Sequence, residues 1–232
     1  MAAISDNIMI TGVTVKGYFE ENCYFYIDDQ TKHGFLIDPG AQAEGLLRMI
    51  RKEGWTIEKI LLTHGHFDHT GAVNDIRKAL GIPVYAYEDA DMYLLDTRMN
   101  LSALCGEYVV VENVNYLKDG DVVRSEANPA FSLKALHTPG HTPDSVIYYS
   151  ETELAAFVGD TIFQGSIGNW QYPGGNFQDL QRSILETVFS LPDNTKLYSG
   201  HSDPTAVGTE KRRYNMIWSP KVLVMTPITS NY

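Results

Sequence analysis

Alternating apolar and polar positions dominate the N-terminal part of the chain. A two-residue period is typical of strands that bury one face. The pattern predicts strands over residues 7–15, 23–27 and 34–37. The third strand runs into Asp38-Pro39-Gly40, a turn signal. The period then becomes helical, with Leu46 and Ile50 on one face and Gly54 suited to end the helix.

Helical and β patterns alternate through most of the remaining chain. The pattern predicts strands over 59–63, 83–87, 145–149, 154–158 and 196–198, and helices over 72–80, 89–95 and 206–216. Residues 98–105 are expected to form an irregular loop. Residues 108–136 show a β pattern in which Lys118–Asp121 is suited to a hairpin turn.

A further helix is expected after the glycine-rich stretch 165–175. Asn176 can cap it, and Leu180, Ile184 and Val188 form its apolar stripe. The strands thus come in two sets, each interleaved with helices, which predicts a layered α/β fold. Since no linker, repeat or low-complexity tract is visible, we expect residues 1–232 to form one domain.

Composition narrows the class of protein. Hydrophobic residues make up 44% of the chain and charged residues 20%, which is typical of a soluble globular protein. Cys23 and Cys105 are too few for a disulfide framework, and the N-terminus does not resemble a signal peptide, so we expect a cytoplasmic protein. No apolar run approaches the roughly 18 residues of a membrane span. The net charge of −11 argues against a nucleic-acid partner.

The strongest chemical signal is a histidine-rich segment directly after a predicted strand. His64, His66, Asp68 and His69 lie within six residues. His64 and His66 alternate and can approach one metal ion from the same side, while Asp68 and His69 turn towards a second. Neutral imidazoles are available as ligands near pH 7, because their ordinary pKa is about 6.5. The alternative is a polar surface loop that holds three histidines by chance.

Three further candidate ligands weaken that alternative. His141, Asp160 and His201 each follow a predicted strand, in small-residue turns with the sequences TPGHT, VGDT and YSGH. Metal sites are commonly assembled from such strand ends. We therefore favour a metal site.

These motifs together resemble the metallo-β-lactamase-fold hydrolases, and most closely their small glyoxalase II-like branch. The resemblance spans nearly the whole chain, because the motifs follow the family's order. They are residues 36–40, 64–69, 138–143, 159–161 and 200–201, with 100–102, 165–168 and 173–175 also similar to that branch.

The resemblance implies an α/β fold, a four-layer αββα sandwich, with metals at one edge between two mixed sheets. It also implies that His64, His66 and His141 hold one ion, that Asp68, His69 and His201 hold another, and that Asp160 bridges them. Two divalent ions are thus expected, with zinc favoured and iron or manganese also suited to nitrogen and oxygen ligands.

Such a pair of ions lowers the pKa of a shared water, and the resulting hydroxide can attack a carbonyl carbon. In this interpretation Asp68 and Asp160 are the catalytic carboxylates, and Asp68 also steers a proton. Asp38 is expected to support the histidine loop from behind without binding metal. His137, four residues before His141, is the less favoured candidate ligand.

Some positions differ from the larger glyoxalase II enzymes. Asn169 and Trp170 stand where those enzymes place a basic residue against the thiol peptide, so Asn169, Trp170 and Tyr172 are the candidate substrate contacts. Trp170 and Tyr172 could form an apolar wall. Their C-terminal helical domain is expected to be absent. The apolar tail within residues 218–232 packs either on its own domain or across a homodimer.

The leading functional hypothesis is a binuclear metal hydrolase of small thioesters, such as S-lactoylglutathione or another low-molecular-weight thiol conjugate. A second hypothesis, also hydrolytic, is a lactonase or other esterase. A third hypothesis is a persulfide dioxygenase with a single iron held by two His and one Asp. A metal-stabilised binding protein is the non-enzyme alternative. A small-molecule substrate is expected in the enzyme readings, with neither nucleic acid nor membrane as a partner.

Overall fold

The computed structural model describes residues 8–217, of which 215–217 are described by their backbone alone. The strands form two large sheets and a short two-stranded ribbon. The strands are β1 (Ile8–Lys16), β2 (Glu20–Asp28), β3 (His33–Ile37), β4 (Thr56–Leu61), β5 (Val84–Tyr87), β6 (Asn115–Leu117), β7 (Val122–Arg124), β8 (Ser132–His137), β9 (Val146–Ser150), β10 (Ala155–Gly159), β11 (Ile162–Phe163), β12 (Ser166–Ile167), β13 (Lys196–Ser199) and β14 (Thr205–Ala206). The α-helices are α1 (Ala43–Glu53), α2 (Phe67–Thr70), α3 (Val73–Leu80), α4 (Asp91–Leu94), α5 (Phe177–Arg182) and α6 (Val207–Ile217).

The first sheet has the order β1-β2-β3-β4-β5-β6. Its first three strands are antiparallel neighbours, whereas β3 to β6 run parallel. Parallel neighbours need a crossover, and α1 and α3 supply the crossovers on either side of β4. The parallel strands therefore end at the same edge of the sheet.

The second sheet has the order β14-β13-β10-β9-β8-β7, and its β10 and β13 are parallel. The crossover between these two strands is α5, which continues through a π-helical turn at Ser183–Thr187. Asn176 Oδ1 accepts the N–H of Asp179 at 3.1 Å, so the predicted helix cap is confirmed. The predicted stripe of Leu180, Ile184 and Val188 is fully buried.

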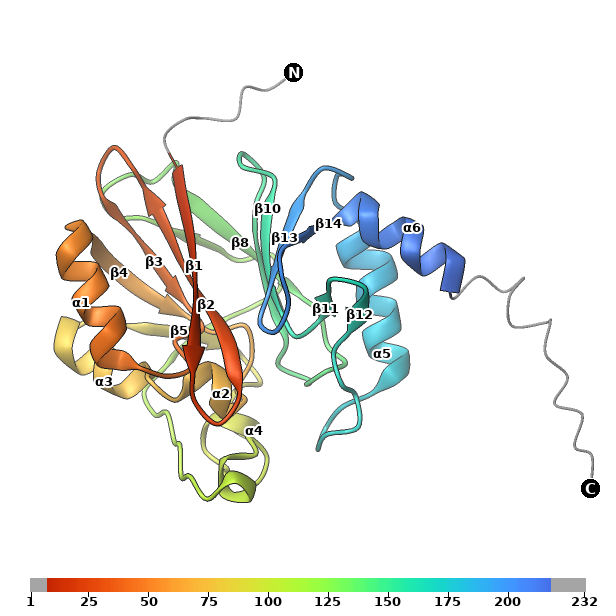
Figure 1. Cartoon of the computed structure of the whole chain (residues 1–232), viewed down its shortest axis with the longest axis horizontal. Helices are drawn as coiled ribbons and strands as arrows, with labels where there is room; N and C mark the ends of the chain where they lie inside the picture. Colours follow the sequence, from red (N-terminus) through yellow and green to blue (C-terminus); the bar gives the residue numbers. More distant parts are fainter. Residues whose placement is uncertain (1–7, 218–232) are drawn as a thin grey trace, which may run out of the picture.

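Four layers enclose three apolar cores (Figure 1). Leu46 and Val73 belong to the core between the first sheet and its helices α1 and α3. Tyr26 and Tyr148 belong to the core between the two sheets. Ile184 belongs to the third core, between the second sheet and α5. The predicted αββα sandwich is therefore confirmed.

The turn at Lys118–Asp121 does not close a hairpin, so this prediction is wrong. A turn is present, because Asp121 N–H donates to Lys118 O at 3.1 Å. Its flanking strands belong to different sheets, since β6 pairs with β5 and β7 with β8. Leu117 and Val123 both face the core between the sheets. The apolar pattern is therefore the same for a hairpin as for a chain that crosses between sheets.

Other differences from the predictions are small. Residues 108–114 form no strand, although Val111 is buried and its N–H donates to Leu94 O. The expected irregular loop contains one 3₁₀ turn at Ser102–Cys105. The ribbon β11–β12 extends into the glycine-rich stretch, and α2 lies inside the histidine-rich segment. Residues 218–232 lie outside the described part, so the prediction for the tail stays a prediction.

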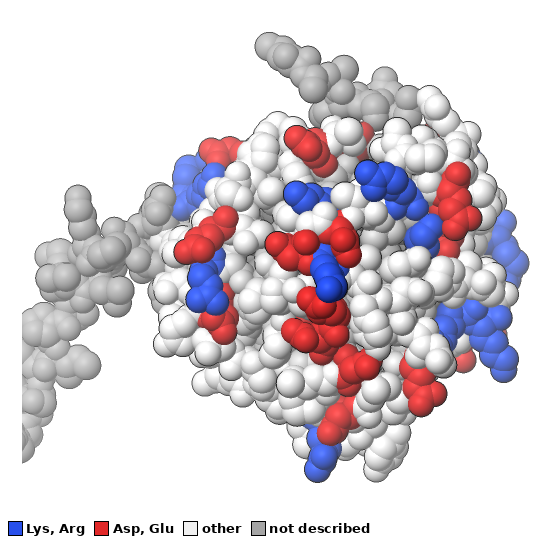
Figure 2. Space-filling view, turned by 180° about the vertical axis from the view of Figure 1, so that it is seen from behind, with Lys and Arg blue, Asp and Glu red and all other residues white. Residues whose placement is uncertain are grey.

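The surface carries charges of both signs. Lys and Arg side chains are interspersed with Asp and Glu over the face in Figure 2, and no continuous basic patch is visible on it. Among residues 8–217, no helix is long and apolar enough to cross a membrane.

Candidate metal centre

Turns that follow β3, β4, β8, β10 and β13 meet at one edge of the two sheets. Backbone bonds join the sheets there, because Asn22 N–H donates to Gly200 O at 2.7 Å and Val146 N–H donates to Thr63 O at 2.8 Å. All seven side chains predicted as metal ligands lie in this region: His64, His66, Asp68, His69, His141, Asp160 and His201.

The first ligand group consists of three buried histidines. His66 Nδ1 lies 3.2 Å from His64 Nε2 and 2.9 Å from His141 Nε2. Two nitrogens that bind one tetrahedral ion at about 2.0–2.1 Å are separated by roughly 3.3 Å. The three nitrogens are therefore spaced as ligands of a single ion would be.

The second group contains Asp68, His69 and His201. His201 Nε2 lies 3.3 Å from His69 Nε2 and 3.3 Å from Asp68 Oδ2, while Asp68 Oδ2 and His69 Nε2 are 4.0 Å apart. This group has a different composition from the first, because it contains a carboxylate. It is suited to hold a second ion.

Asp160 lies between the two groups. Its Oδ1 is 3.4 Å from His69 Nε2, and its Oδ2 is 3.5 Å from His201 Nε2 and 3.6 Å from His141 Nε2. Oδ1 is buried and has no hydrogen-bond partner. A buried carboxylate oxygen rarely lacks a partner, and a metal ion would supply one. The donor atoms present therefore fit two divalent ions that share this residue.

Burial keeps the first group neutral. It lowers the pKa of His66 to about 3, with His141 adding to the effect, and it also lowers the pKa values of His64 and His141. Burial alone would raise the pKa of Asp160, but His69 and His201 outweigh it and hold that pKa well below its ordinary value. The first group thus offers neutral imidazoles beside an ionised carboxylate. In the second group burial is outweighed by Asp160 and Asp68, which raise the pKa values of His69 and His201, so these two histidines must release protons when an ion binds.

In His69, His141 and His201, the ring nitrogen that does not face the other ligands contacts a neighbouring oxygen. His141 Nδ1 lies 2.8 Å from Asn169 O, and His201 Nδ1 lies 2.8 Å from Glu20 O. His69 Nδ1 lies 3.1 Å from Asp38 Oδ2. Such contacts fix the ring orientation and the tautomer of a ligand.

Asp38 lies behind the histidine loop, in the position that the sequence analysis expected. Its Oδ1 accepts the N–H of Thr63 at 2.8 Å, and its Oδ2 accepts the Thr63 hydroxyl at 2.6 Å. The same hydroxyl lies 3.1 Å from His64 Nδ1. Asp38 therefore supports histidines of both groups, and Thr63 is a supporting residue that sequence reasoning missed.

Two buried carboxyl groups near the centre were also missed. Glu21 lies 3.7 Å from His69 Nδ1, and neither of its oxygens has a hydrogen-bond partner. Burial raises its pKa well above the ordinary value. Asp144 lies against Gly65, inside the histidine loop, and its oxygens make no hydrogen bond of ordinary length and geometry. Glu21 follows another glutamate and Asp144 follows a proline. In such polar or turn-like sequence, a charged residue is normally expected to be exposed.

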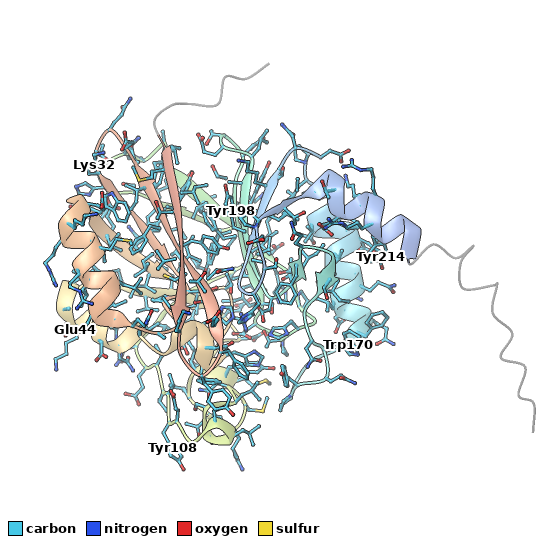
Figure 3. All side chains as sticks on the ribbon, viewed as in Figure 1. Lys32, Glu44, Tyr108, Trp170, Tyr198 and Tyr214 are labelled. Atoms are coloured by element: carbon cyan, nitrogen blue, oxygen red, sulfur yellow. The ribbon has the colours of Figure 1, made fainter. Side chains whose placement is uncertain are left out.

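Only two of the three candidate substrate contacts line the cavity next to the metal ligands. Asn169 and Tyr172 line a cavity of about 280 Å³ above the metal ligands. Trp170 is half-buried and packs against Phe177, beside α5 (Figure 3), and it does not line that cavity. His137 stacks on Tyr87 and is absent from the ligand clusters of the described residues.

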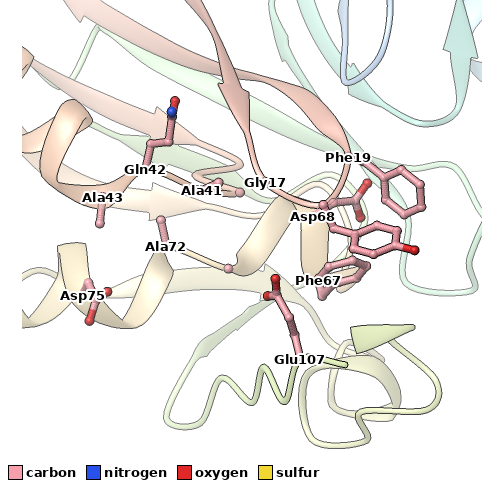
Figure 4. A pocket seen from close by; sticks show the side chains of 13 residues that line it. Gly17, Phe19, Ala41, Gln42, Ala43, Phe67, Asp68, Ala72, Asp75 and Glu107 are labelled. Carbon is pink, nitrogen blue, oxygen red and sulfur yellow. The ribbon is translucent and has the colours of Figure 1, made fainter. Parts of the chain in front are cut away.

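A second cavity of about 150 Å³ lies beside the first. Phe19 and Asp68 line both, and Phe67 stands next to them in Figure 4. The carboxylates of Asp75 and Glu107 also line the second cavity. The predicted ligand Asp68 thus lines both cavities.

The model of the metallo-beta-lactamase superfamily matches residues 17–201, which contain all seven predicted ligands. The chain belongs to this superfamily. The fold, the order of the motifs and the buried His/Asp clusters all agree with the match. Membership and the clusters together indicate a metal-dependent hydrolase.

Individual relatives of this superfamily cover most of the chain. "Probable metallo-hydrolase YqgX" of Bacillus subtilis (strain 168) is 39% identical over 84% of this chain and 91% of its own length. "Hydroxyacylglutathione hydrolase GloC" of Haemophilus influenzae (strain ATCC 51907 / DSM 11121 / KW20 / Rd) is 31% identical over 89% of this chain and 95% of its own. The crystal structure of TTHA1623 in a di-iron-bound form is 33% identical, with a TM-score of 0.76 over 88% of this chain and 98% of that one.

Replacement of Gly200 by Ala should impair metal binding. An added Cβ would lie 2.5 Å from His69 Cε1 and 2.6 Å from Asp160 Oδ1, so the ligands must move apart. We expect metal affinity, measured by titration of the metal-free protein, to fall by about tenfold or more. Gly45→Ala is the matched control, because its Cβ meets nothing closer than 3.9 Å. Equal affinities of the two variants would contradict the packing described above.

Asp144 should make stability depend on pH. Burial raises its pKa to about 7, which the nearby Thr142 side chain and Gly65 N–H counteract only in part. The unfolded chain releases this proton near pH 3.9, so stability falls as pH rises from about 4 to about 7.

Asp144→Asn removes the ionisation. In urea unfolding of the metal-free protein, the free energy lost between about pH 5 and pH 8 should therefore be smaller than in the parent by about 2–3 kcal/mol. The exposed Asp203→Asn should keep the parent's dependence. An unchanged pH dependence of Asp144→Asn would show that this carboxyl is hydrated.

Proposed function

We propose that the protein is a binuclear metal-dependent hydrolase of small thioesters, similar in reaction to glyoxalase II. The observation that carries the proposal is the pair of ligand groups with Asp160 between them, at the floor of an open cavity. The name of the Haemophilus influenzae relative, a hydroxyacylglutathione hydrolase, supports a thioester as the substrate.

Ions bound by these groups would polarise a carbonyl and lower the pKa of a water molecule. Asp160 is buried and ionised and would balance the charge between the two sites. Asp68 lines the cavity, with its Oδ2 3.3 Å from His201 Nε2. We assign to Asp68 the uptake and return of a proton at the cavity floor.

We propose zinc as the native metal, because the ligands are imidazole nitrogens and carboxylate oxygens at spacings that suit a tetrahedral ion. Iron is the alternative, which the di-iron form of TTHA1623 supports. The persulfide dioxygenase reading needs a single iron with two His and one Asp, whereas this chain presents two complete groups. Lactone or ester hydrolysis uses the same attack on a carbonyl and differs in leaving group.

We further propose a cytoplasmic protein with a small-molecule partner. Cys23 and Cys105 are free thiols, which suits a reducing compartment. The acidic net charge of −11 disfavours nucleic acid.

Purified protein should hydrolyse at least one member of a panel of small thioesters, in which S-D-lactoylglutathione is compared with thioesters of other small thiols. Turnover should disappear with a chelator and return with zinc or iron, while metal analysis of the same sample gives about two ions per chain. A protein that carries two ions and cleaves lactones but no thioester would overturn the choice of substrate. Oxygen consumption with a persulfide would overturn hydrolysis itself.

Asp160→Ala should lose most bound metal and more than about a hundredfold in turnover, because the Asp160 carboxylate lies within 3.6 Å of histidines of both ligand groups. Metal analysis after dialysis and initial rates measure the two effects. Asp203→Ala removes an exposed carboxylate close in sequence to His201 and should leave both unchanged. Full metal content in Asp160→Ala would contradict the bridging role.

A further inference from the structure

The walls of the cavity above the metal ligands are apolar. Phe19, Leu101, Phe163 and Tyr172 line it, and they come from three different loops and the ribbon strand β11. The Phe163 ring lies 6.1 Å from the ring of His201, and the Tyr172 ring lies 5.8 Å from that of His66. Substituents of a carbonyl group bound at the cavity floor would therefore contact mainly these apolar side chains.

The same cavity offers no cationic side chain. Among the described residues, neither this cavity nor the neighbouring one is lined by Lys or Arg. Glu20 lies in the lining, but its carboxylate pairs with Lys16 at 3.0 Å, so that cation already has a partner. Asp75 and Glu107 make the neighbouring cavity acidic. A substrate carboxylate would lose water here without gaining a Lys or Arg partner.

These walls are held in place from behind. The Tyr93 hydroxyl donates to Pro173 O at 2.7 Å, and this contact fixes the segment that carries Tyr172. Phe19 packs against Phe67, with ring centroids 6.1 Å apart. The ribbon that carries Phe163 is tied to α6, since Gly165 N–H donates to the buried Glu210 at 3.0 Å. The apolar surface is thus a built feature of the site.

The size of the cavity also favours a small, uncharged substrate group. Its volume of about 280 Å³ is just below the roughly 300–1,000 Å³ of typical small-molecule sites. It suits a short acyl or thiol group better than a charged peptide conjugate.

We propose that the substrates are thioesters whose thiol arm is short, apolar and uncharged, and that the site discriminates against the carboxylates of glutathione. This inference rests on the proposed function and names the substrate class within it. Phe163 and Tyr172 are the specificity-determining side chains, because they stand over the two ligand groups. Asn169 is the exposed polar position in the lining.

The test is equilibrium binding, which does not depend on turnover. The zinc-loaded protein is titrated calorimetrically with two thioethers that cannot be hydrolysed, S-hexyl-N-acetylcysteamine and S-hexylglutathione. We expect the neutral thioether to bind about tenfold more tightly or better. Equal affinities, or tighter binding of the glutathione thioether, would overturn the proposal.

Variants of the cavity wall test which side chains set the preference between the two thioethers. Asn169→Arg places a cation in the lining and should raise affinity for S-hexylglutathione by about tenfold, with little change for the neutral thioether. Gln171→Arg adds the same charge two residues away, outside the cavity, and should leave both affinities unchanged. Phe163→Ala should weaken binding of the neutral thioether alone. A gain in Gln171→Arg equal to that in Asn169→Arg would show that net charge, and not the cavity wall, sets the preference.

The outcomes separate this inference from the proposed function. Preferred binding of the neutral thioether without cleavage of any thioester would retain the specificity and refute thioester hydrolysis. Cleavage of thioesters with equal binding of both thioethers would retain the hydrolase and refute the specificity.

Discussion

The close approach of histidine nitrogens and carboxylate oxygens, the candidate metal-ligand atoms, is the constraint on which the rest of this structure depends. Five of the seven histidines of the chain meet Asp68 and Asp160 with donor separations of about 2.9–4.0 Å. Nitrogen atoms at such distances repel unless a proton or an ion lies between them. His64, His66, His69 and His141 are buried, so little water can surround these rings to offset the repulsion. Cations held by the two groups would therefore stabilise this edge of the sandwich.

The fold meets this constraint by converging strands and by small residues. Parallel strands β3, β4 and β5 end together, and β10 and β13 do the same in the second sheet. Loops from both sheets thus reach one point without long insertions. Gly200 leaves room between His69 and Asp160, and Gly40 packs against the backbone of Asp68. Behind the ligands, Asp38 and Thr63 hold imidazoles of both groups through one hydrogen-bond network.

The layered α/β fold and the seven candidate ligands could be predicted from the sequence, because apolar periodicity and a turn with a metal-ligating side chain are local signals. The four-layer arrangement and the division of the ligands into two groups were implied by the family resemblance. The crossing at Lys118–Asp121 could not, since Leu117 and Val123 would be buried by either topology. Glu21 and Asp144 could not be identified as buried, because nothing local distinguishes a buried carboxyl from an exposed one. Trp170 was expected at the substrate because of its place in sequence, whereas the chain turns its ring towards Phe177.

The charge of the site gives the proposed substrate preference a physical basis. A protein with net charge −11 and no Lys or Arg in the described cavity walls has only the bound metal ions to attract an anion there. A carboxylate of the substrate would therefore compete with the reacting carbonyl for the same ions. Hydrolysis requires the carbonyl, and not a carboxylate, to occupy that position. A neutral substrate avoids this competition, while its apolar arm gains contact with Phe163 and Tyr172. Apolar walls around a cationic floor thus favour productive over inhibitory binding.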